Sequence, residues 1–220
     1  MMTAVTAVMI AYNNEADSLT RLQRDLLPAL RDPRLDYELI VIDNSAAESP
    51  LLRYAVTGNP GDNGRYYWQQ GDNLMYGPAL NLVATLANHP YLLYICTSHG
   101  YSNDPTWALD LLEPLITDTA GEVGMTGSLQ DAGPPEAMGF PASLPQRHIQ
   151  GGVFAARTQT IIDYPYVNGE FAQSGSDLHQ CFQLMSAGLR LVDVPTIRSV
   201  WFHRDLGEGP FKYVHDSGWE

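Results

Sequence analysis

Short polar segments follow four apolar runs in the first half of the sequence, and their side chains suit the binding of a nucleotide. If these runs are parallel strands of one sheet, the segments meet in a crevice at the carboxyl ends of the strands. Tyr12 can stack on a base there, and Asp43 can accept hydrogen bonds from a base or a ribose. The segments comprise Tyr12 and Asn13, Asp43 and Asn44, residues 70–73 and residues 97–99.

The apolar patterns also indicate which elements bring these segments together. Apolar runs at 5–11 and 37–42 predict two strands, and the leucines between residues 19 and 30 have helical spacing. Asn14 can cap that helix. A strand–helix–strand unit makes the two strands parallel with a right-handed connection, and its repetition predicts an α/β fold with a doubly wound sheet. Further strands are expected at 66–70 and 91–97, and further helices at 78–88 and 106–116.

The second half has a less regular pattern. Residues 131–146 contain four prolines and predict a long surface loop, which in a compact domain is often functional. Residues 177–187 predict a helix that Gly188 ends. Its buried face is expected to comprise Leu178, Cys181, Phe182 and Met185. Strands are expected within 121–129 and at 148–156, 191–194 and 197–202.

The composition is that of a globular protein with an acidic surface. With 220 residues and 45% hydrophobic side chains, a single domain spanning residues 1–220 is expected. The net charge of -13 disfavours non-specific binding to nucleic acid or to an anionic membrane. No apolar run approaches the roughly 20 residues of a membrane helix, and no secretory signal pattern is present. Cys96 and Cys181 have no metal-binding spacing, which fits reduced thiols in a cytoplasmic protein.

Two common nucleotide-binding motifs are absent from the sequence. There is no Gly-x-Gly-x-x-Gly and no Walker-type phosphate loop, which disfavours a dehydrogenase or a kinase. A nucleotidyltransferase shares the sheet but usually has a Gly-rich, basic loop near its start, and residues 11–17 lack one.

Several stretches of the chain resemble, in order and spacing, the inverting family-2-type glycosyltransferases of the GT-A fold. The resemblance rests on VTAVMIAYNN at 5–14, YELIVIDNS at 37–45 and NLMYGPALN at 73–81, and it covers about residues 3–203. It implies a Rossmann-like, mostly parallel central sheet with helices on both faces. It also implies a nucleotide-sugar-binding half at about 1–105, an acceptor-binding half at about 106–203 and a C-terminal tail at 204–220.

The resemblance further implies transfer of a sugar from a nucleoside-diphosphate sugar to an acceptor hydroxyl with inversion. Asp177 would be the general base, taking a proton from the hydroxyl while its oxygen attacks the anomeric carbon. Gly151 and Gly152 match the acceptor-side glycine pair of these enzymes. The residues that match the donor site are Tyr12, Asn13, Asp43, Asn73, Asn81 and Ser98.

The Asp-x-Asp metal motif of these enzymes is missing, because its place holds Cys96, Thr97 and Ser98. His99 follows directly, and His203 matches a late histidine that contacts the metal or the diphosphate in some members. These two histidines are therefore the candidate ligands of a divalent metal, Mn²⁺ or Mg²⁺, and imidazole favours a transition metal over Mg²⁺. Without a metal, a protonated histidine, Arg204 or backbone N–H groups would stabilise the leaving diphosphate.

Each assignment has a simpler structural alternative. Asp177 can be an ordinary acid at a helix N-terminus, and Asp43 can cap a turn. Asn73 and Asn81 can tie down a loop and a helix start. For the whole chain, the alternative is a non-catalytic protein that binds a nucleotide sugar on the same fold. The acceptor of an active enzyme can be a carbohydrate, a lipid carrier, a natural product or a protein.

Overall fold

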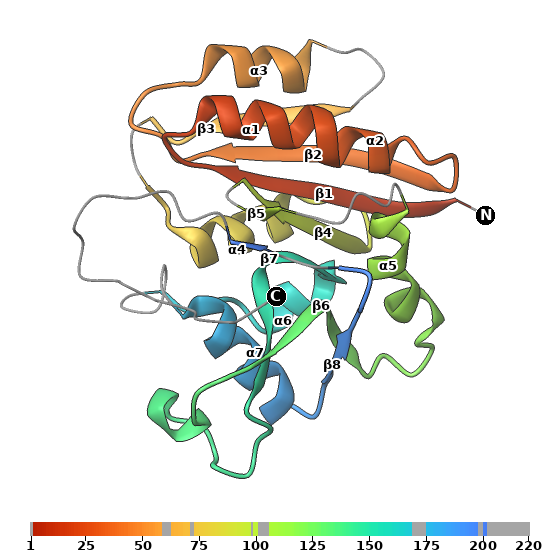
Figure 1. Cartoon of the computed structure of the whole chain (residues 1–220), viewed down its shortest axis with the longest axis vertical. Coiled ribbons are helices and arrows are strands. Elements are labelled where there is room, and N and C mark those ends of the chain that lie inside the picture. The colour runs from red at the N-terminus through yellow and green to blue at the C-terminus, as the bar shows by residue number, and fades with distance from the viewer. Residues whose placement is uncertain are drawn as a thin grey trace, which may run out of the picture.

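A sheet with helices on both faces forms the centre of the molecule (Figure 1). The computed structural model describes residues 2–58, 63–70, 73–97, 99–100, 106–168, 175–197 and 200–201, with the backbone alone at 99–100 and 200–201. All statements below on structure concern these residues.

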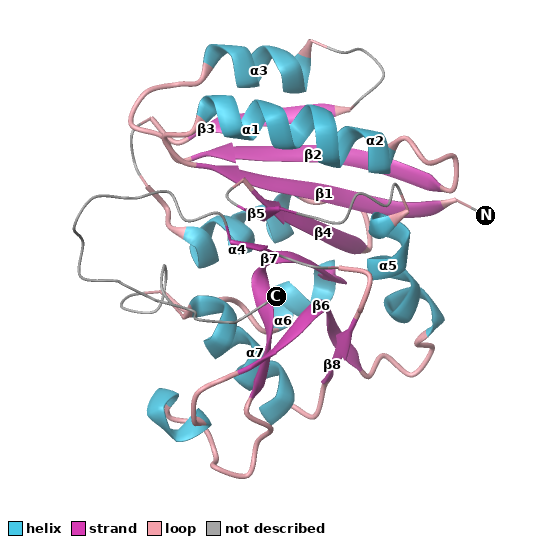
Figure 2. Ribbon diagram, in the orientation of Figure 1, coloured by secondary structure: helices cyan, strands magenta, loops and turns pink. Residues whose placement is uncertain are grey.

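The sheet has seven strands, six of which run in the same direction. From edge to edge they are β3 (Gly64–Trp68), β2 (Leu35–Asp43), β1 (Thr3–Ala11), β4 (Tyr91–Cys96), β7 (Arg147–Arg157), β6 (Val123–Asp131) and β8 (Arg190–Asp193). β1 pairs in parallel with both β2 and β4, as the strand–helix–strand pattern predicts (Figure 2). β7 is antiparallel to its neighbours β4 and β6. A separate antiparallel pair joins β5 (His99–Gly100) to β9 (Val200–Trp201).

Two layers of helices cover the sheet. One face carries α1 (Glu15–Arg21), the π-helical turn η1 (Leu22–Leu26), α2 (Leu27–Leu30), α3 (Pro50–Thr57) and α5 (Trp107–Thr117). The other face carries α4 (Tyr76–Leu86), α6 (Thr158–Asp163) and α7 (Ser176–Ser186). The doubly wound α/β architecture is therefore confirmed. Among the described residues, no helix combines the length and the apolar character needed to cross a bilayer.

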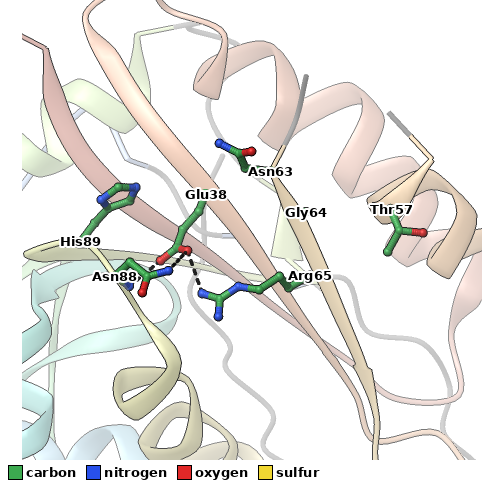
Figure 3. Close-up of a pocket in the computed structure, with 7 residues that line it drawn as sticks. All are labelled: Glu38, Thr57, Asn63, Gly64, Arg65, Asn88 and His89. Carbon is green, nitrogen blue, oxygen red and sulfur yellow. Dashed lines mark hydrogen bonds and ion pairs between the residues drawn. The ribbon is translucent and has the colours of Figure 1, made fainter. Parts of the chain in front are cut away.

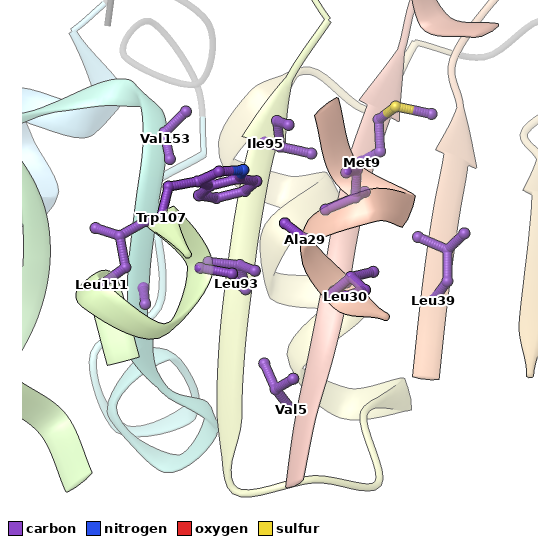
Figure 4. Packing of buried hydrophobic residues seen from close by; sticks show 14 of the residues in the cluster. Val5, Met9, Ala29, Leu30, Leu39, Leu93, Ile95, Trp107, Leu111 and Val153 are labelled. Atoms are coloured by element: carbon purple, nitrogen blue, oxygen red, sulfur yellow. The ribbon is translucent and has the colours of Figure 1, made fainter. Parts of the chain in front are cut away.

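Alternate residues of the central strands divide between two hydrophobic cores. Val5 and Met9 of β1 pack in the core beneath α2 and α5, whereas Val8 packs in the core beneath α4 and α7. Figure 4 shows Leu30 of α2 and Trp107 of α5 lying over the central strands. Each fully buried side chain of this size contributes roughly 1.5–3 kcal/mol, so the alternation fixes the register of the strands that carry the site.

The first crossover helix contains a π-helical turn that the sequence pattern does not predict. Leu22, Leu26 and Leu30 are fully buried, as their spacing predicts. The π-helical turn spans residues 22–26 and is followed by Pro28 at the start of α2. Since proline has no N–H for the carbonyl four residues earlier, the helix cannot continue its regular ladder through this point.

Three elements differ from the sequence prediction. Helices α3 and α6 were not predicted, because α3 buries only Leu52 and Val56 and α6 has six residues, too few for a clear period. The strand expected at 197–202 is restricted to Val200–Trp201 among the described residues. Ile197 instead closes a turn, donating its N–H to the carbonyl of Val194 at 2.9 Å.

The buried face of α7 is also rotated from the predicted one. Cys181 and Phe182 are buried as expected, but Leu178 and Met185 are only half-buried, while Gln180 and Leu184 are buried. The Gln180 side chain donates from Nε2 to the carbonyl of Tyr164 at 2.6 Å. Gln180, which the apolar pattern does not place on the buried face, is thus covered by a polar contact with the segment after α6.

Residues 132–146 form the predicted long loop, which connects β6 to β7 as a hairpin. Ala132 donates its N–H to the carbonyl of Gln146 at 2.8 Å, and a short 3₁₀ helix, η2 (Pro135–Met138), lies inside the loop. Phe140 packs against His179 and Phe182 of α7, with ring centroids 4.9 and 5.9 Å away. The loop is thereby fixed against the helix that carries Asp177.

Candidate functional site

The carboxyl ends of four strands lie level with one another. The register pairs Ala11 of β1 with Asp43 of β2, Asp43 with Trp68 of β3, and Ile10 of β1 with Cys96 of β4. The polar segments after these strands therefore begin at one edge of the sheet, as the sequence predicts. Residues 71, 72 and 98 of these segments lie outside the described residues.

Asn13 and Asn14 connect the segment after β1 to those after β2 and β4. Asn13 donates its N–H to Ser45 Oγ at 2.7 Å and accepts the Ala46 N–H on Oδ1 at 3.1 Å. Its φ of 49° lies in the left-handed region, which asparagine tolerates better than most residues. Asn14 donates from Nδ2 to Thr97 Oγ1 at 2.6 Å. Two adjacent amides thus hold three strand-end segments together.

Asn14 precedes α1 as expected, but its side chain does not cap the helix backbone. Its Oδ1 accepts the Ser18 hydroxyl at 2.9 Å and the Tyr12 N–H at 3.1 Å. Its position between the helix and the strand ends makes it part of the site framework, a role that the sequence pattern did not reveal.

Asp43 lies beneath this layer. Its side chain is fully buried, with Oδ1 accepting the Ser45 N–H at 2.9 Å and Oδ2 accepting both the Ser49 N–H at 3.2 Å and the Tyr66 hydroxyl. Burial raises the pKa of Asp43, but the hydrogen bonds from Ser45, Tyr66 and Ser49 outweigh it and leave the pKa below its usual value. The carboxylate therefore holds the segment that follows β2, and both of its oxygens already accept hydrogen bonds from the protein.

Asn44 carries a buried, unpaired polar atom at this edge. The residue is 2% exposed, and its N–H donates to the carbonyl of Ala11 at 2.9 Å. Its side-chain Oδ1 has no hydrogen-bond partner within the described part of the chain. Leaving such an oxygen unpaired costs about 1–3 kcal/mol, which an N–H donor of a ligand would recover. Its position directly after Asp43 was the only sequence signal for it.

Two aromatic side chains occupy the same edge. Tyr12 follows β1 and is 51% exposed, so it offers the aromatic face expected of a stacking residue. Trp68 ends β3 and donates from Nε1 to the carbonyl of Ser45 at 3.0 Å. Trp68 thus supports the segment after β2 from the side opposite Asn13.

The asparagines expected at the donor site have partners inside the protein. Asn73 accepts the Met75 N–H on Oδ1 at 2.8 Å, in a loop where Met75 has a φ of 65°. Asn81 of α4 donates from Nδ2 to the Tyr166 carbonyl and accepts the Tyr166 N–H, both at 2.8 Å. These bonds favour the simpler alternative, a loop tie for Asn73 and a bridge from α4 to the segment after α6 for Asn81.

Gly151 and Gly152 lie beside the carboxyl end of β4. The antiparallel register pairs Tyr94 with Phe154 and Ile95 with Val153. The next residues of β7 toward its start are the two glycines, so they come level with the end of β4. The middle of β7 therefore reaches the same edge of the sheet as the polar segments.

Asp177, in the first turn of α7, is held against Gly151. Its Oδ2 accepts the Gly151 N–H at 3.0 Å, and its Oδ1 accepts the Leu178 N–H at 2.9 Å. A Cβ at position 151 would lie 3.0 Å from Asp177 Oδ2 and 3.1 Å from the Tyr76 hydroxyl. The close approach that glycine permits here is that of Asp177, whereas the sequence resemblance suggested an approaching sugar.

The described side chains do not form a metal site. No three His, Cys, Asp or Glu residues cluster among them. Thr97, in the place of the missing acidic motif, is bound to Asn14. His203 and the side chain of His99 lie outside the described part of the structure, as does Ser98. A metal at this edge would therefore depend on ligands beyond the described side chains.

The opposite edge of the sheet has a hollow of about 530 Å³ (Figure 3). At its centre, Glu38 accepts the Thr6 hydroxyl at 2.6 Å, the Asn88 N–H at 2.6 Å and the Arg65 guanidinium at 2.7 Å. The paired charges and saturated carboxylate indicate a structural role at the amino-terminal side of β3. The hollow is lined by Glu38, Thr57, Asn63, Gly64, Arg65, Asn88 and His89.

No protein-family model matches the sequence, and a search of curated proteins gave no match. Solved structures do match over most of the chain, and they show that it has the GT-A fold of nucleotide-sugar glycosyltransferases. One is glucosyl-3-phosphoglycerate synthase from Mycobacterium tuberculosis with Mn²⁺, UDP-glucose and phosphoglyceric acid. Its TM-score is 0.59 at 17% identity, over 93% of this chain and 73% of that one. Another is a mannosyltransferase from Pyrobaculum calidifontis with GDP-mannose and Mn²⁺. Its TM-score is 0.66 at 16% identity, over 89% of this chain and 55% of that one.

Proposed function

We propose that the chain is a glycosyltransferase that moves a sugar from a nucleoside-diphosphate sugar to an acceptor hydroxyl. The observation that carries the proposal is the convergence of two half-sites on one edge of the sheet. The strand-end layer of β1, β2 and β4 forms one half. Asp177, bonded to Gly151 beside the end of β4, forms the other. The structural neighbours with UDP-glucose and GDP-mannose support a donor of this class.

The donor base would bind at the first half-site. Tyr12, half of whose surface is exposed, would stack on the base. Asn44 Oδ1, which lacks a partner among the described residues, would accept an N–H of the base. Asn13 and Asp43 would act indirectly, since their hydrogen bonds hold the segment that carries Asn44 and Ser45.

The transfer step would use Asp177 as general base. Its carboxylate would take the proton of the acceptor hydroxyl as that oxygen forms a bond to the anomeric carbon. The bond from this carbon to the diphosphate would break on the opposite face, giving inversion and a free nucleoside diphosphate. A positioned base contributes roughly 10²- to 10⁴-fold to such a step. A divalent metal at His99 and His203 would add charge stabilisation for the leaving diphosphate.

Calorimetric titration with UDP, GDP and dTDP, each with Mn²⁺ and again with EDTA, tests the donor site. The proposal requires that one nucleotide binds with a clear preference, and that Asn44→Ala weakens this binding. Binding that persists in EDTA would remove the metal from the proposal but retain the donor site. No binding of any of the three nucleotides would contradict the proposal.

A non-catalytic protein that binds a nucleotide sugar is the second candidate. The sequence feature that favours it is the segment Cys96, Thr97 and Ser98 in the place of the acidic metal motif. Asp177→Asn separates the two, because an enzyme would lose turnover and keep nucleotide binding. A binding protein would show no release of nucleoside diphosphate in either form.

A further inference from the structure

Tyr76, the first residue of α4, reaches the same point as Asp177. A Cβ placed on Gly151 would lie 3.1 Å from the Tyr76 hydroxyl oxygen and 3.0 Å from Asp177 Oδ2. The two oxygens therefore flank one position on β7. The ring is held from two sides, edge-on to Tyr94 at 5.4 Å and to Tyr166 at 5.6 Å between centroids. The hydroxyl is thus held in a fixed position close to Gly151, the residue to which Asp177 is bonded.

The Tyr76 hydroxyl is buried and makes no hydrogen bond of standard geometry within the described residues. Burial raises the pKa of Tyr76 well above its usual value, and the nearby Tyr166, Tyr94 and Asp177 add to this, as does a contact between the Tyr76 and Tyr166 hydroxyls that falls outside standard hydrogen-bond geometry. The phenol therefore keeps its proton at any working pH and remains a donor. Unpaired buried hydroxyls are uncommon in folded proteins, and each calls for an explanation.

We propose that Tyr76 donates a hydrogen bond to the acceptor oxygen and positions it for Asp177. This rests on the proposed glycosyl transfer. The acceptor oxygen would accept a hydrogen bond from the Tyr76 hydroxyl on one lone pair. It would transfer its own proton to Asp177 Oδ2. Its second lone pair would remain for the anomeric carbon. Tyr76 keeps its proton throughout, so the step balances with Asp177 as the sole base.

The crowding around Gly151 favours a small, polar reacting group on the acceptor molecule. Asp177 and Tyr76 crowd Gly151 so closely that a methyl group on that residue would touch both. In the proposed arrangement a primary or secondary hydroxyl, or a water molecule, would pair with both groups. Water is therefore the simplest acceptor probe, and its attack appears as release of nucleoside diphosphate without transfer.

The test compares Tyr76→Phe with Tyr94→Phe. Both remove one hydroxyl from the same ring cluster, but Tyr94 is not among the atoms nearest Gly151. Nucleoside diphosphate release is measured from UDP-glucose and GDP-mannose, with water alone and with phosphoglyceric acid. We expect Tyr76→Phe to lower kcat about tenfold, the value of one lost hydrogen bond in the transition state. Its nucleotide Kd should stay within about twofold, and its Tm should stay or rise because no described bond is lost.

Tyr94→Phe should retain turnover near that of the unmodified protein. Equal turnover in Tyr76→Phe and the unmodified protein would overturn the inference, and so would a loss of turnover matched by a fall in Tm. If Asp177→Asn abolishes turnover while Tyr76→Phe does not, the role of Tyr76 fails and the proposed function stands. If the unmodified protein neither binds a nucleotide nor releases one, both fail.

Discussion

Replacement of Gly151 by alanine should push Asp177 away from its position on β7. The added Cβ would meet Asp177 Oδ2 at 3.0 Å, Asp177 Cβ at 3.1 Å and the Tyr76 hydroxyl at 3.1 Å. Carbon contacts are most favourable at about 3.5–4.0 Å, so all three contacts are too short. Overpacking of this kind costs about 1–3 kcal/mol, which lowers Tm by about 2–4 °C per kcal/mol in a chain of this length.

Gly133→Ala is the matched control for this substitution. A Cβ at Gly133 would have nothing within 4 Å, so the free energy of unfolding of this variant should lie within about 1 kcal/mol of that of the unmodified protein. Thermal unfolding of both variants measures the difference. Turnover of Gly151→Ala should also fall, by up to about tenfold, since relief of these contacts moves the base a few tenths of an ångström out of alignment.

The clash can be assigned to Asp177 by a double-mutant cycle. In an Asp177→Ala background the contact to Oδ2 is removed, while the contacts to the Cβ of residue 177 and to the Tyr76 hydroxyl remain, so Gly151→Ala should cost less there than in the unmodified protein. Equal costs in the two backgrounds would refute this reasoning. An unchanged Tm and turnover in Gly151→Ala would refute it more directly.

Three further substitutions test the division of roles at the two edges of the sheet. Asn44→Ala should weaken nucleotide binding about tenfold in calorimetry with Tm nearly unchanged, since its Oδ1 has no described partner to lose. Asp43→Asn should lower the free energy of unfolding by about 1–3 kcal/mol, because Ser45, Ser49 and Tyr66 donate to the carboxylate. The pKa of Asp43 is lowered in the folded state, so this stabilisation is present above the unfolded value of about 3.9 and is lost as the pH falls through the folded pKa. Denaturant titrations should therefore show that the unmodified protein exceeds Asp43→Asn in free energy of unfolding by a constant amount above about pH 5. This difference should become smaller below that pH, and a difference that grows in acid would contradict the assignment. Glu38→Gln should lower Tm through its bonds to Thr6, Asn88 and Arg65 without changing nucleotide Kd, and a changed Kd would place the hollow in the donor site.

The sheet could be predicted from sequence because each central strand is an uninterrupted apolar run. Val5, Val8 and Met9 are all fully buried on one or the other face of the sheet. The sequence of β1 is therefore a continuous apolar run and does not alternate between apolar and polar residues. The short helix α3 has only two buried side chains, Leu52 and Val56, and no such signal. The π-helical turn at 22–26 was hidden because the buried leucines keep their spacing through it.

The position of the candidate site at the strand ends could be predicted from sequence, but its contacts could not be assigned. The strand-end rule places Asp43 correctly, yet its partner Tyr66 lies on the next strand, and nothing local shows that the carboxylate is saturated. The adjacent Asn44 carries the unpaired oxygen instead. Gly151 likewise looked like a place for a ligand, and it is the hydrogen-bond partner of Asp177, 26 residues away in sequence. Such long-range pairings depend on packing that a linear pattern does not contain.

The most direct test of the proposed transfer is the release of nucleoside diphosphate by the unmodified protein and by Asp177→Asn. UDP-glucose and GDP-mannose serve as donors, with Mn²⁺ and with EDTA, and nucleotide binding is measured on the same samples. We expect release by the unmodified protein from one donor, a loss of roughly 10²-fold or more in Asp177→Asn, and similar nucleotide Kd values for both. Full turnover in Asp177→Asn, or nucleotide binding without any release by the unmodified protein, would contradict catalysis by Asp177 at this edge of the sheet.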